Sequence, residues 1–183
     1  MAVRDILRMG DPRLLRVATP VPEDAFGSIW LSGLLQDMYD TMAAANGAGL
    51  AAPQIGVNSQ VVVFGSGQPN PRYPDAPVIP LTVLINPQLT RLGDAEEADW
   101  EGCLSVPGER YPLRRSDRVI LTATNLQGNE FTIEATGWLA RIFQHEYDHL
   151  LGVLYVDRLT HPHDVDARDA VTDAGWGEPG LSW

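Results

Sequence analysis

The chain of 183 residues contains a single cysteine, Cys103, so no disulfide can form within it. This absence excludes a disulfide-stabilised scaffold and favours a reducing compartment. No apolar run approaches the ~18 residues that a membrane-spanning helix needs. The N-terminal stretch alternates charged and apolar residues, and it has neither the apolar core nor the small-residue cleavage site of a signal peptide. We therefore expect a cytoplasmic location and no membrane partner.

Basic residues are also scarce. The 13 Lys and Arg face 24 Asp and Glu, which gives a formal net charge of −11 and a pI near 4.6. Nucleic acids and anionic membranes favour a basic surface, so direct nucleic-acid binding is not expected. The length suits one domain with a core of its own, which we place at residues 1–160. A peripheral C-terminal tail is expected at residues 161–183, where the sequence is acidic and poor in apolar residues.

Hydrophobic periodicity predicts two helices and several separate strands. Apolar residues recur at helical spacing over residues 29–45 and again over residues 138–151. The Pro-rich stretch 65–80 predicts a loop. Strands are expected at residues 61–64, 81–86, 119–124 and 130–136, with Pro87 closing the second and a hairpin joining the last two. These patterns favour an α+β fold, a single domain of mostly antiparallel strands packed around a central metal-binding helix.

The strongest chemical signal is His145-Glu146-Tyr147-Asp148-His149, which lies inside the second predicted helix. Histidines at positions i and i+4 lie on one face, close enough for both imidazoles to bind one metal ion. Glu146 follows the first of them and can take a proton from a metal-activated water without being a ligand. The alternative interpretation is an exposed helix face that carries these residues by chance.

Two histidines leave a metal site incomplete, and the third ligand separates the classes of hydrolase. A metzincin peptidase has histidine where this chain has Tyr155, and a thermolysin-like peptidase needs a downstream glutamate, for which only Glu178 remains. Cys103 would complete a tetrahedral Cys-His-His site with its fourth position open for water. A metallopeptidase that cuts internal bonds, and a non-catalytic binder of N-terminal peptides, remain as alternatives.

Three segments resemble the motifs of the peptide deformylase family, in the family's order and at about its spacing. They are Gly47-Ala48-Gly49-Leu50-Ala51-Ala52-Pro53-Gln54, Glu101-Gly102-Cys103-Leu104-Ser105 and His145-Glu146-Tyr147-Asp148-His149. The resemblance implies a hydrolase that removes the formyl group from the N-terminal formylmethionine of newly made polypeptides and releases formate. It also implies one divalent ion held by Cys103, His145 and His149, with Fe²⁺ expected in the cell and Ni²⁺, Co²⁺ or Zn²⁺ able to replace it.

The same resemblance assigns catalytic roles to residues around this ion. Glu146 would take the proton of the attacking water and return it to the departing amine. The side-chain amide of Gln54 and the backbone N–H of Leu104 would donate to the tetrahedral oxyanion. Gly47 and Gly49 would let the backbone run close beside the substrate chain.

Substrate selection is expected to depend on the helix face that leads to His145. Trp138, Arg141 and Ile142 precede that histidine by seven, four and three residues, and in this family the face helps to line the methionine pocket. The alternative makes Trp138 a core residue and Arg141 a solvent-facing one. Arg110 matches a family position that contacts the peptide backbone. The implied partners are N-formylmethionyl peptides and transiently the ribosome, and the expected state is a monomer.

Two acidic residues adjoin the expected ligands. Metal-bound histidine commonly donates its other N–H to a carboxylate, so either Glu101 or Asp148 could orient the site. For Asp148, a solvent-facing helix position is an equal alternative.

Overall fold

The computed structural model describes residues 2–159, so the tail predicted at 161–183 lies outside the described residues. Its helices are α1 (Ile29–Ala44) and α2 (Gly137–Leu150), with short 3-10 helices η1 (Pro12–Leu15), η2 (Glu23–Ala25), η3 (Ala52–Ile55) and η4 (Tyr155–Arg158). Its strands are β1 (Gly49–Ala51), β2 (Val61–Phe64), β3 (Thr82–Arg91), β4 (Glu96–Cys103), β5 (Val106–Ser116), β6 (Arg118–Thr124) and β7 (Glu130–Thr136). Within residues 2–159, neither α-helix has the length and hydrophobicity to cross a membrane.

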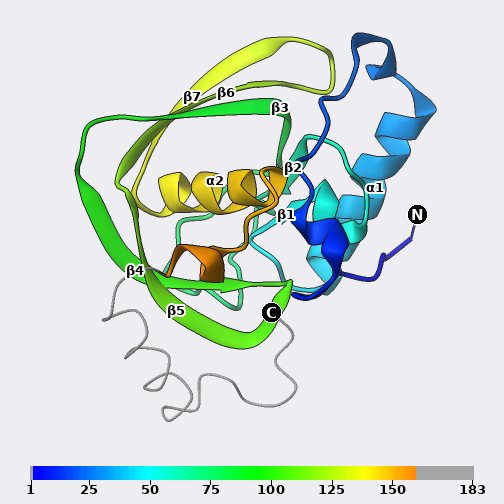
Figure 1. Cartoon of the computed structure of the whole chain (residues 1–183). Coiled ribbons are helices and arrows are strands. Elements are labelled where there is room, and N and C mark those ends of the chain that lie inside the picture. The colour runs from blue at the N-terminus through cyan, green and yellow to red at the C-terminus, as the bar shows by residue number, and fades with distance from the viewer. Residues whose placement is uncertain (1, 160–183) are drawn as a thin grey trace.

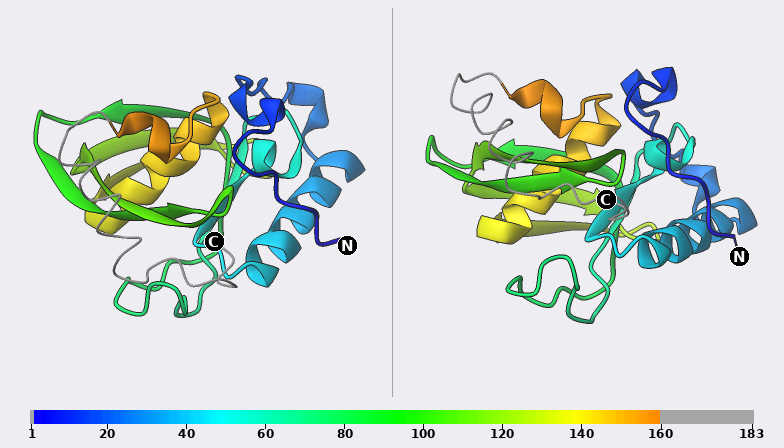
Figure 2. Two further views of the ribbon diagram at one scale, coloured as in Figure 1. Left: turned by 60° about the horizontal axis from the view of Figure 1, so that its bottom comes forward. Right: turned by 90° about the horizontal axis from the view of Figure 1, so that it is seen from below.

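The strands form two antiparallel sheets, which confirms the predicted α+β class. One sheet has the order β1-β2-β3-β6-β7, and the other is the β4–β5 hairpin. Helix α2 lies between the β3-β6-β7 part of the large sheet and the β4–β5 hairpin (Figure 1). Helix α1 packs on the other side of β1 and β2 from α2 (Figure 2). The predicted central helix is therefore confirmed.

Helix α2 presents different residues to the two layers that enclose it. Phe143 and Leu150, seven residues apart, belong to the core cluster on the large sheet, and the Phe143 ring lies 5.0 Å from that of Phe64 in β2. His145 and His149, one turn apart, instead approach the β4–β5 hairpin through Cys103 and Glu101. The helix face that carries the two histidines thus points into the protein interior.

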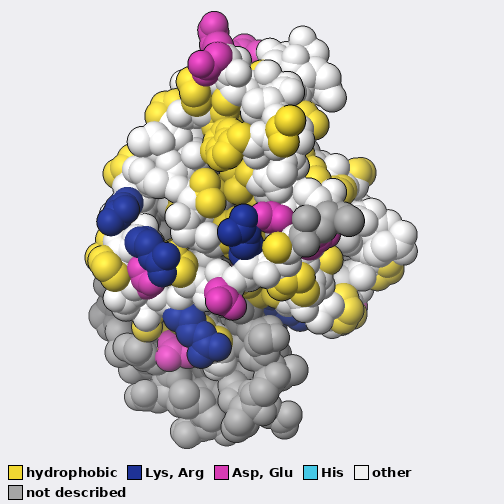
Figure 3. Space-filling model, turned by 90° about the vertical axis from the view of Figure 1, so that its right-hand side faces the viewer, with side chains coloured by type: hydrophobic (Ala, Val, Ile, Leu, Met, Phe, Trp, Pro, Cys, Tyr) yellow, Lys and Arg dark blue, Asp and Glu magenta, His cyan; other side chains and the backbone are white. Residues whose placement is uncertain are grey.

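Helix α1 packs a second core against β1, β2 and β3. Its N-terminus is capped by Ser28, whose hydroxyl accepts a hydrogen bond from the Leu31 N–H. The helix ends before Asn46, which adopts a positive φ of 51°. The predicted helix at 29–45 is confirmed to within one residue. On the face seen in Figure 3, apolar and charged side chains are mixed and none of the described histidines is visible.

One predicted strand boundary is wrong. β3 does not stop at Pro87 but continues to Arg91, with a register shift between Ile85 and Gln88. Asn86 takes a positive φ of 50° at this irregularity, and its side chain exchanges hydrogen bonds of 2.7 and 2.8 Å with the backbone of Val21. The bulge places the proline, which has no N–H, where the regular ladder is interrupted.

Candidate metal centre

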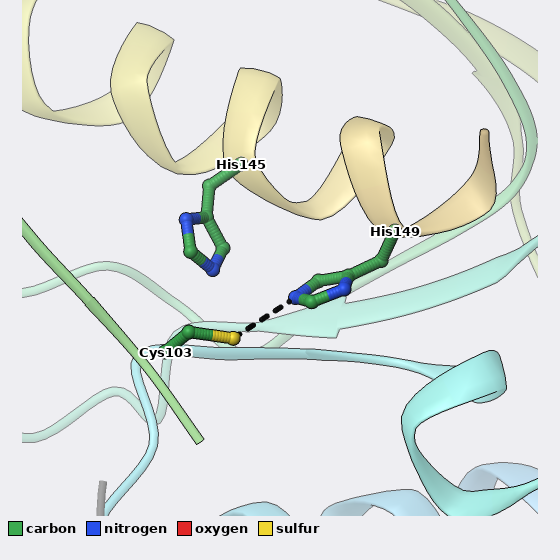
Figure 4. Close-up of side chains that lie close together, drawn as sticks. All are labelled: Cys103, His145 and His149. Atoms are coloured by element: carbon green, nitrogen blue, oxygen red, sulfur yellow. Dashed lines mark hydrogen bonds between the residues drawn. The ribbon is translucent and has the colours of Figure 1, made fainter. Parts of the chain in front are cut away.

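Three potential ligands meet where β4 ends against α2. The nearest ligand atoms of Cys103, His145 and His149 all lie within 4.8 Å of one another. The Cys103 Sγ is 3.3 Å from the Nε2 of His149, and both imidazoles point toward the thiol (Figure 4). The structure therefore brings together the three residues that the sequence predicted as ligands.

The position of Cys103 follows from an irregularity in the β4–β5 hairpin. The register shifts between Gly102 and Cys103, so that Cys103 pairs with Val106 across a tight turn. Within this turn the Ser105 N–H lies 3.4 Å from the Cys103 Sγ and donates to it. The turn fixes the sulfur in a buried position facing α2.

A buried carboxylate orients the first histidine. The Oε2 of Glu101 lies 3.0 Å from the Nδ1 of His145. Burial alone would raise the pKa of Glu101, but hydrogen bonds from Arg115 hold that pKa far below its ordinary value. An ionised Glu101 accepts from Nδ1–H, which leaves the Nε2 of His145 free to face a metal ion.

The donor set fits a divalent metal ion. Burial would raise the pKa of the Cys103 thiol, but His149 and His145 hold it well below its usual value, as a thiolate ligand requires. One thiolate and two imidazoles suit a tetrahedral site with one open position. The Oε2 of Glu146 is buried and has no hydrogen-bond partner among the described residues. This oxygen is therefore free to accept a proton or a hydrogen bond beside the three potential ligands.

Glu146 lies on α2 with its carboxylate packed against the backbone of β1. A Cβ placed on Gly49 would come within 2.8 Å of the Glu146 carboxyl carbon, so any other residue at this position would force the carboxylate to move. Burial raises the pKa of Glu146. A raised pKa brings a carboxylate closer to the range in which it can both accept and return a proton.

Gln54 has a fixed orientation in η3. Its Oε1 accepts a hydrogen bond of 2.9 Å from the Ala51 N–H, which directs its Nε2 toward Ser105 Oγ at 3.1 Å and Cys103 Sγ at 3.7 Å. The amide N–H groups thus face the predicted metal centre. Leu104, the second predicted oxyanion donor, lines the same pocket.

The pocket beside these groups is small and mixed in polarity. Its cavity volume is about 50 Å³. Trp138, Arg141 and Ile142 line it together with Gly49, as the helix spacing predicted. Arg141 is only 4% exposed, so the alternative that made it solvent-facing is wrong.

Two predicted substrate contacts lie next to this pocket rather than among the residues that line it. A Cβ on Gly47 would meet the Leu104 Cδ1 at 3.0 Å, so this glycine packs against the Leu104 side chain. Arg110 lies in an adjoining groove, with its guanidinium carbon 5.1 Å from the centre of the Tyr73 ring.

Two residues of the Pro-rich loop belong to the pocket although the sequence did not predict them. Arg72 and Tyr73 line the pocket, and the Tyr73 ring lies 4.6 Å from that of Trp138. An aromatic residue beside an arginine within a proline-rich loop was the available signal. The loop is anchored near the first motif, because the Asn70 side chain donates to the Gly47 carbonyl at 3.1 Å.

Arg115 and Arg158 were also missed. Asp148 is 4% exposed and accepts from Arg115 Nη1 at 2.5 Å and from Arg158 Nε at 2.7 Å. A solvent-facing Asp148 is therefore wrong, and its connection to His145 runs through Arg115 and Glu101.

A thiolate and two imidazoles that can hold one ion, beside a carboxylate able to take a proton from water, are the parts of a metal-dependent hydrolase. The model of the polypeptide deformylase family matches residues 3–165. The chain is 55% identical over 157 residues to peptide deformylase 2 of Ralstonia nicotianae, covering 86% of this chain and 87% of that protein. It is 54% identical over 159 residues to peptide deformylase 1 of Prochlorococcus marinus, covering 87% and 82%.

Solved structures agree with these relatives. The fold superposes with a TM-score of 0.84 on a class I type b peptide deformylase from Acinetobacter baumannii, at 39% identity, covering 87% of this chain and all of that one. Another structure of that A. baumannii enzyme, bound to Met-Ala-Ser, matches with a TM-score of 0.82 at 39% identity, covering 86% and 98%. The chain belongs to the polypeptide deformylase family, whose members are metal-dependent hydrolases that remove the N-terminal formyl group from newly made polypeptides. The metallopeptidase and non-catalytic alternatives are not favoured.

Proposed function

We propose that Cys103, His145 and His149 hold the divalent ion with which this chain deformylates N-formylmethionyl peptides. The mutual approach of the three ligand atoms carries this assignment, and the family resemblance adds Fe²⁺ as the ion in the cell, with Ni²⁺, Co²⁺ or Zn²⁺ as substitutes. When bound, such an ion would supply Lewis-acid chemistry, which would polarise the formyl group and make water more acidic.

Glu146 is the proposed general base and then the general acid. Its carboxylate takes the proton from the water that attacks the formyl carbon, and it delivers this proton to the departing amine. The buried position of this carboxylate, its raised pKa and the free Oε2 all support the assignment.

Gln54 and Leu104 are the proposed donors to the oxyanion. The hydrogen bond from the Ala51 N–H holds the Gln54 amide with its N–H groups toward the site, so they need no reorganisation during the reaction. The backbone N–H of Leu104 would donate from the turn that follows Cys103. Both groups would bind the oxygen more strongly once it carries negative charge.

Methionine would occupy the pocket lined by Trp138, Ile142 and the aliphatic stem of Arg141. A formyl carbon carries only hydrogen, so a small site can reject an acetyl group by its size. The peptide beyond methionine would pass along Gly47 and Gly49 toward Arg110. The A. baumannii relative bound to Met-Ala-Ser supports a peptide substrate of this form.

We infer a cytoplasmic enzyme with a catalytic domain at residues 1–160, active as a monomer and transiently near the ribosome. The net charge of −11 supports the absence of direct nucleic-acid binding.

Formate release tests this function. Wild type and the Glu146→Gln variant are purified without oxygen, and each is assayed with formyl-Met-Ala-Ser and with the N-acetyl peptide. The metal content of both proteins is measured by mass spectrometry. We expect one equivalent of iron, formate from the formyl peptide alone, and loss of activity in the variant with the metal retained. Full activity of Glu146→Gln would refute the base assignment, and a metal-free active enzyme would refute the ligand assignment.

A further inference from the structure

Arg141 lines the pocket, yet its guanidinium is bound to protein groups on the β4–β5 hairpin. Its Nη1 lies 2.8 Å from Glu101 Oε1, 2.8 Å from the Leu113 carbonyl and 3.3 Å from the Asp99 carbonyl, and its Nη2 lies 2.7 Å from the Glu97 carbonyl. The carbonyls belong to both strands of the hairpin. One side chain therefore ties α2 to β4 and β5.

The carboxylate that Arg141 holds is the one that faces a proposed metal ligand. Glu101 Oε1 accepts from Arg141 and from Arg115 Nε, while Oε2 accepts from Arg115 Nη2 and lies 3.0 Å from His145 Nδ1. Arg141 stands one helical turn before His145. The two residues thus meet the same carboxylate from the same helix.

Arg115 does not provide this support alone. Its Nη1 lies 2.5 Å from Asp148, so its single positive charge is shared between two buried carboxylates. Arg141 supplies a second buried charge at Glu101. Removing it would leave an under-compensated carboxylate next to His145, which would favour a shift of the carboxylate toward Arg115.

We propose that Arg141 is a positioning residue of the metal centre, which acts by holding Glu101 against His145 and by holding β4 against α2. Arg141 can affect both kinds of ligand. Glu101, which it holds, orients His145. Cys103 is the last residue of β4, the strand whose backbone Arg141 binds. This inference deepens the proposed function and rests on the ligand set assigned there.

The test measures metal retention rather than activity. Wild type, Arg141→Met and Arg141→Lys are loaded with Zn²⁺, and its transfer to a chromophoric chelator is followed. We expect Arg141→Met to bind Zn²⁺ about 10–100-fold more weakly, which is the loss typical when the carboxylate partner of a ligating histidine is disturbed. Arg141→Lys should be intermediate, because an ammonium group cannot reach all four acceptors. The matched control, Arg118→Met, removes an exposed ion pair with Glu134 and should retain Zn²⁺ like the wild type.

A double-mutant cycle separates positioning from general destabilisation. Because Glu101→Gln already removes the route through Glu101, adding Arg141→Met should weaken Zn²⁺ binding clearly less in the Glu101→Gln background than in wild type, the remaining loss being the route through β4 and Cys103. Fully additive losses, or unchanged Zn²⁺ retention in Arg141→Met, would overturn the proposal. If circular dichroism shows that Arg141→Met does not fold, Arg141→Lys alone and with Glu101→Gln carries the same comparison. Failure of wild type to bind Zn²⁺ would instead refute the ligand set.

Discussion

Gly49 controls the position of the proposed base, and replacing it tests that claim directly. Carbon atoms in contact lie about 3.5–4.0 Å apart. A Cβ at position 49 would stand 2.8 Å from the carboxyl carbon of Glu146 and 3.0 Å from the Cγ of the same side chain. The carboxylate would therefore have to move by roughly 1 Å in Gly49→Ala.

A displacement of this size has a defined kinetic cost. Misplacing a catalytic group by about 1 Å lowers the rate about 10²-fold, equivalent to roughly 3 kcal/mol of transition-state free energy. We expect kcat for formyl-Met-Ala-Ser to fall by about that factor, while metal content stays the same because Glu146 is not among the three proposed ligands.

Gly33 provides the matched control for this substitution. It lies in α1, and a Cβ there would meet nothing within 4 Å. Gly33→Ala should keep kcat and gain up to about 1 kcal/mol of stability from helix propensity. A folded Gly49→Ala protein with kcat within about threefold of wild type would refute the link between this glycine and the position of the base, since 1 Å predicts far more.

Three further outcomes are expected. Gln54→Ala should lower kcat about 10²–10³-fold, and a loss below about tenfold would contradict an oxyanion role. Trp138→Leu should enlarge the pocket and raise kcat/KM for formyl-Phe relative to formyl-Met peptides about tenfold; an unchanged ratio would place the indole outside the specificity pocket. Hydrogen bonds from the Arg4 side chain and the Ala2 N–H hold the pKa of Asp37 below its usual value. The stability that these hydrogen bonds add is complete above about pH 4, near the pKa of aspartate in the unfolded chain, and is lost as the pH falls through the lower pKa of Asp37 in the folded protein. The difference in Tm between wild type and Asp37→Asn should therefore close in acid.

The sequence predicted α2 and the approach of its two histidines because local spacing determines both. Residues 145 and 149 share a helix face wherever that helix lies, and the apolar residues of α2 recur at helical spacing. Cys103 came from a different consideration, since two histidines required a third ligand. These predictions needed no knowledge of which strands neighbour the helix.

The β4–β5 hairpin could not be predicted in the same way. Its strands carry charged residues at positions that apolar alternation would fill, as in the pairing of Glu97 with Arg115. Tyr111 and Leu113 are buried on one side of β5, and Pro112, which lies between them, is a residue that disfavours a strand. Periodicity therefore gave no strand signal, and the hairpin is stabilised by contacts with η4 and α2 that are distant in sequence.

The charged residues behind the ligands show why tertiary structure was needed. Glu101, Asp148, Arg115 and Arg141 are each 4% exposed and joined by hydrogen bonds, yet they come from three separate elements. A buried ion network of this kind adds little net stability, because well-packed apolar residues often serve as well or better. What apolar residues cannot do is direct a carboxylate oxygen at the Nδ1 of one histidine. The network is therefore better understood as fixing the geometry of the metal centre than as strengthening the fold.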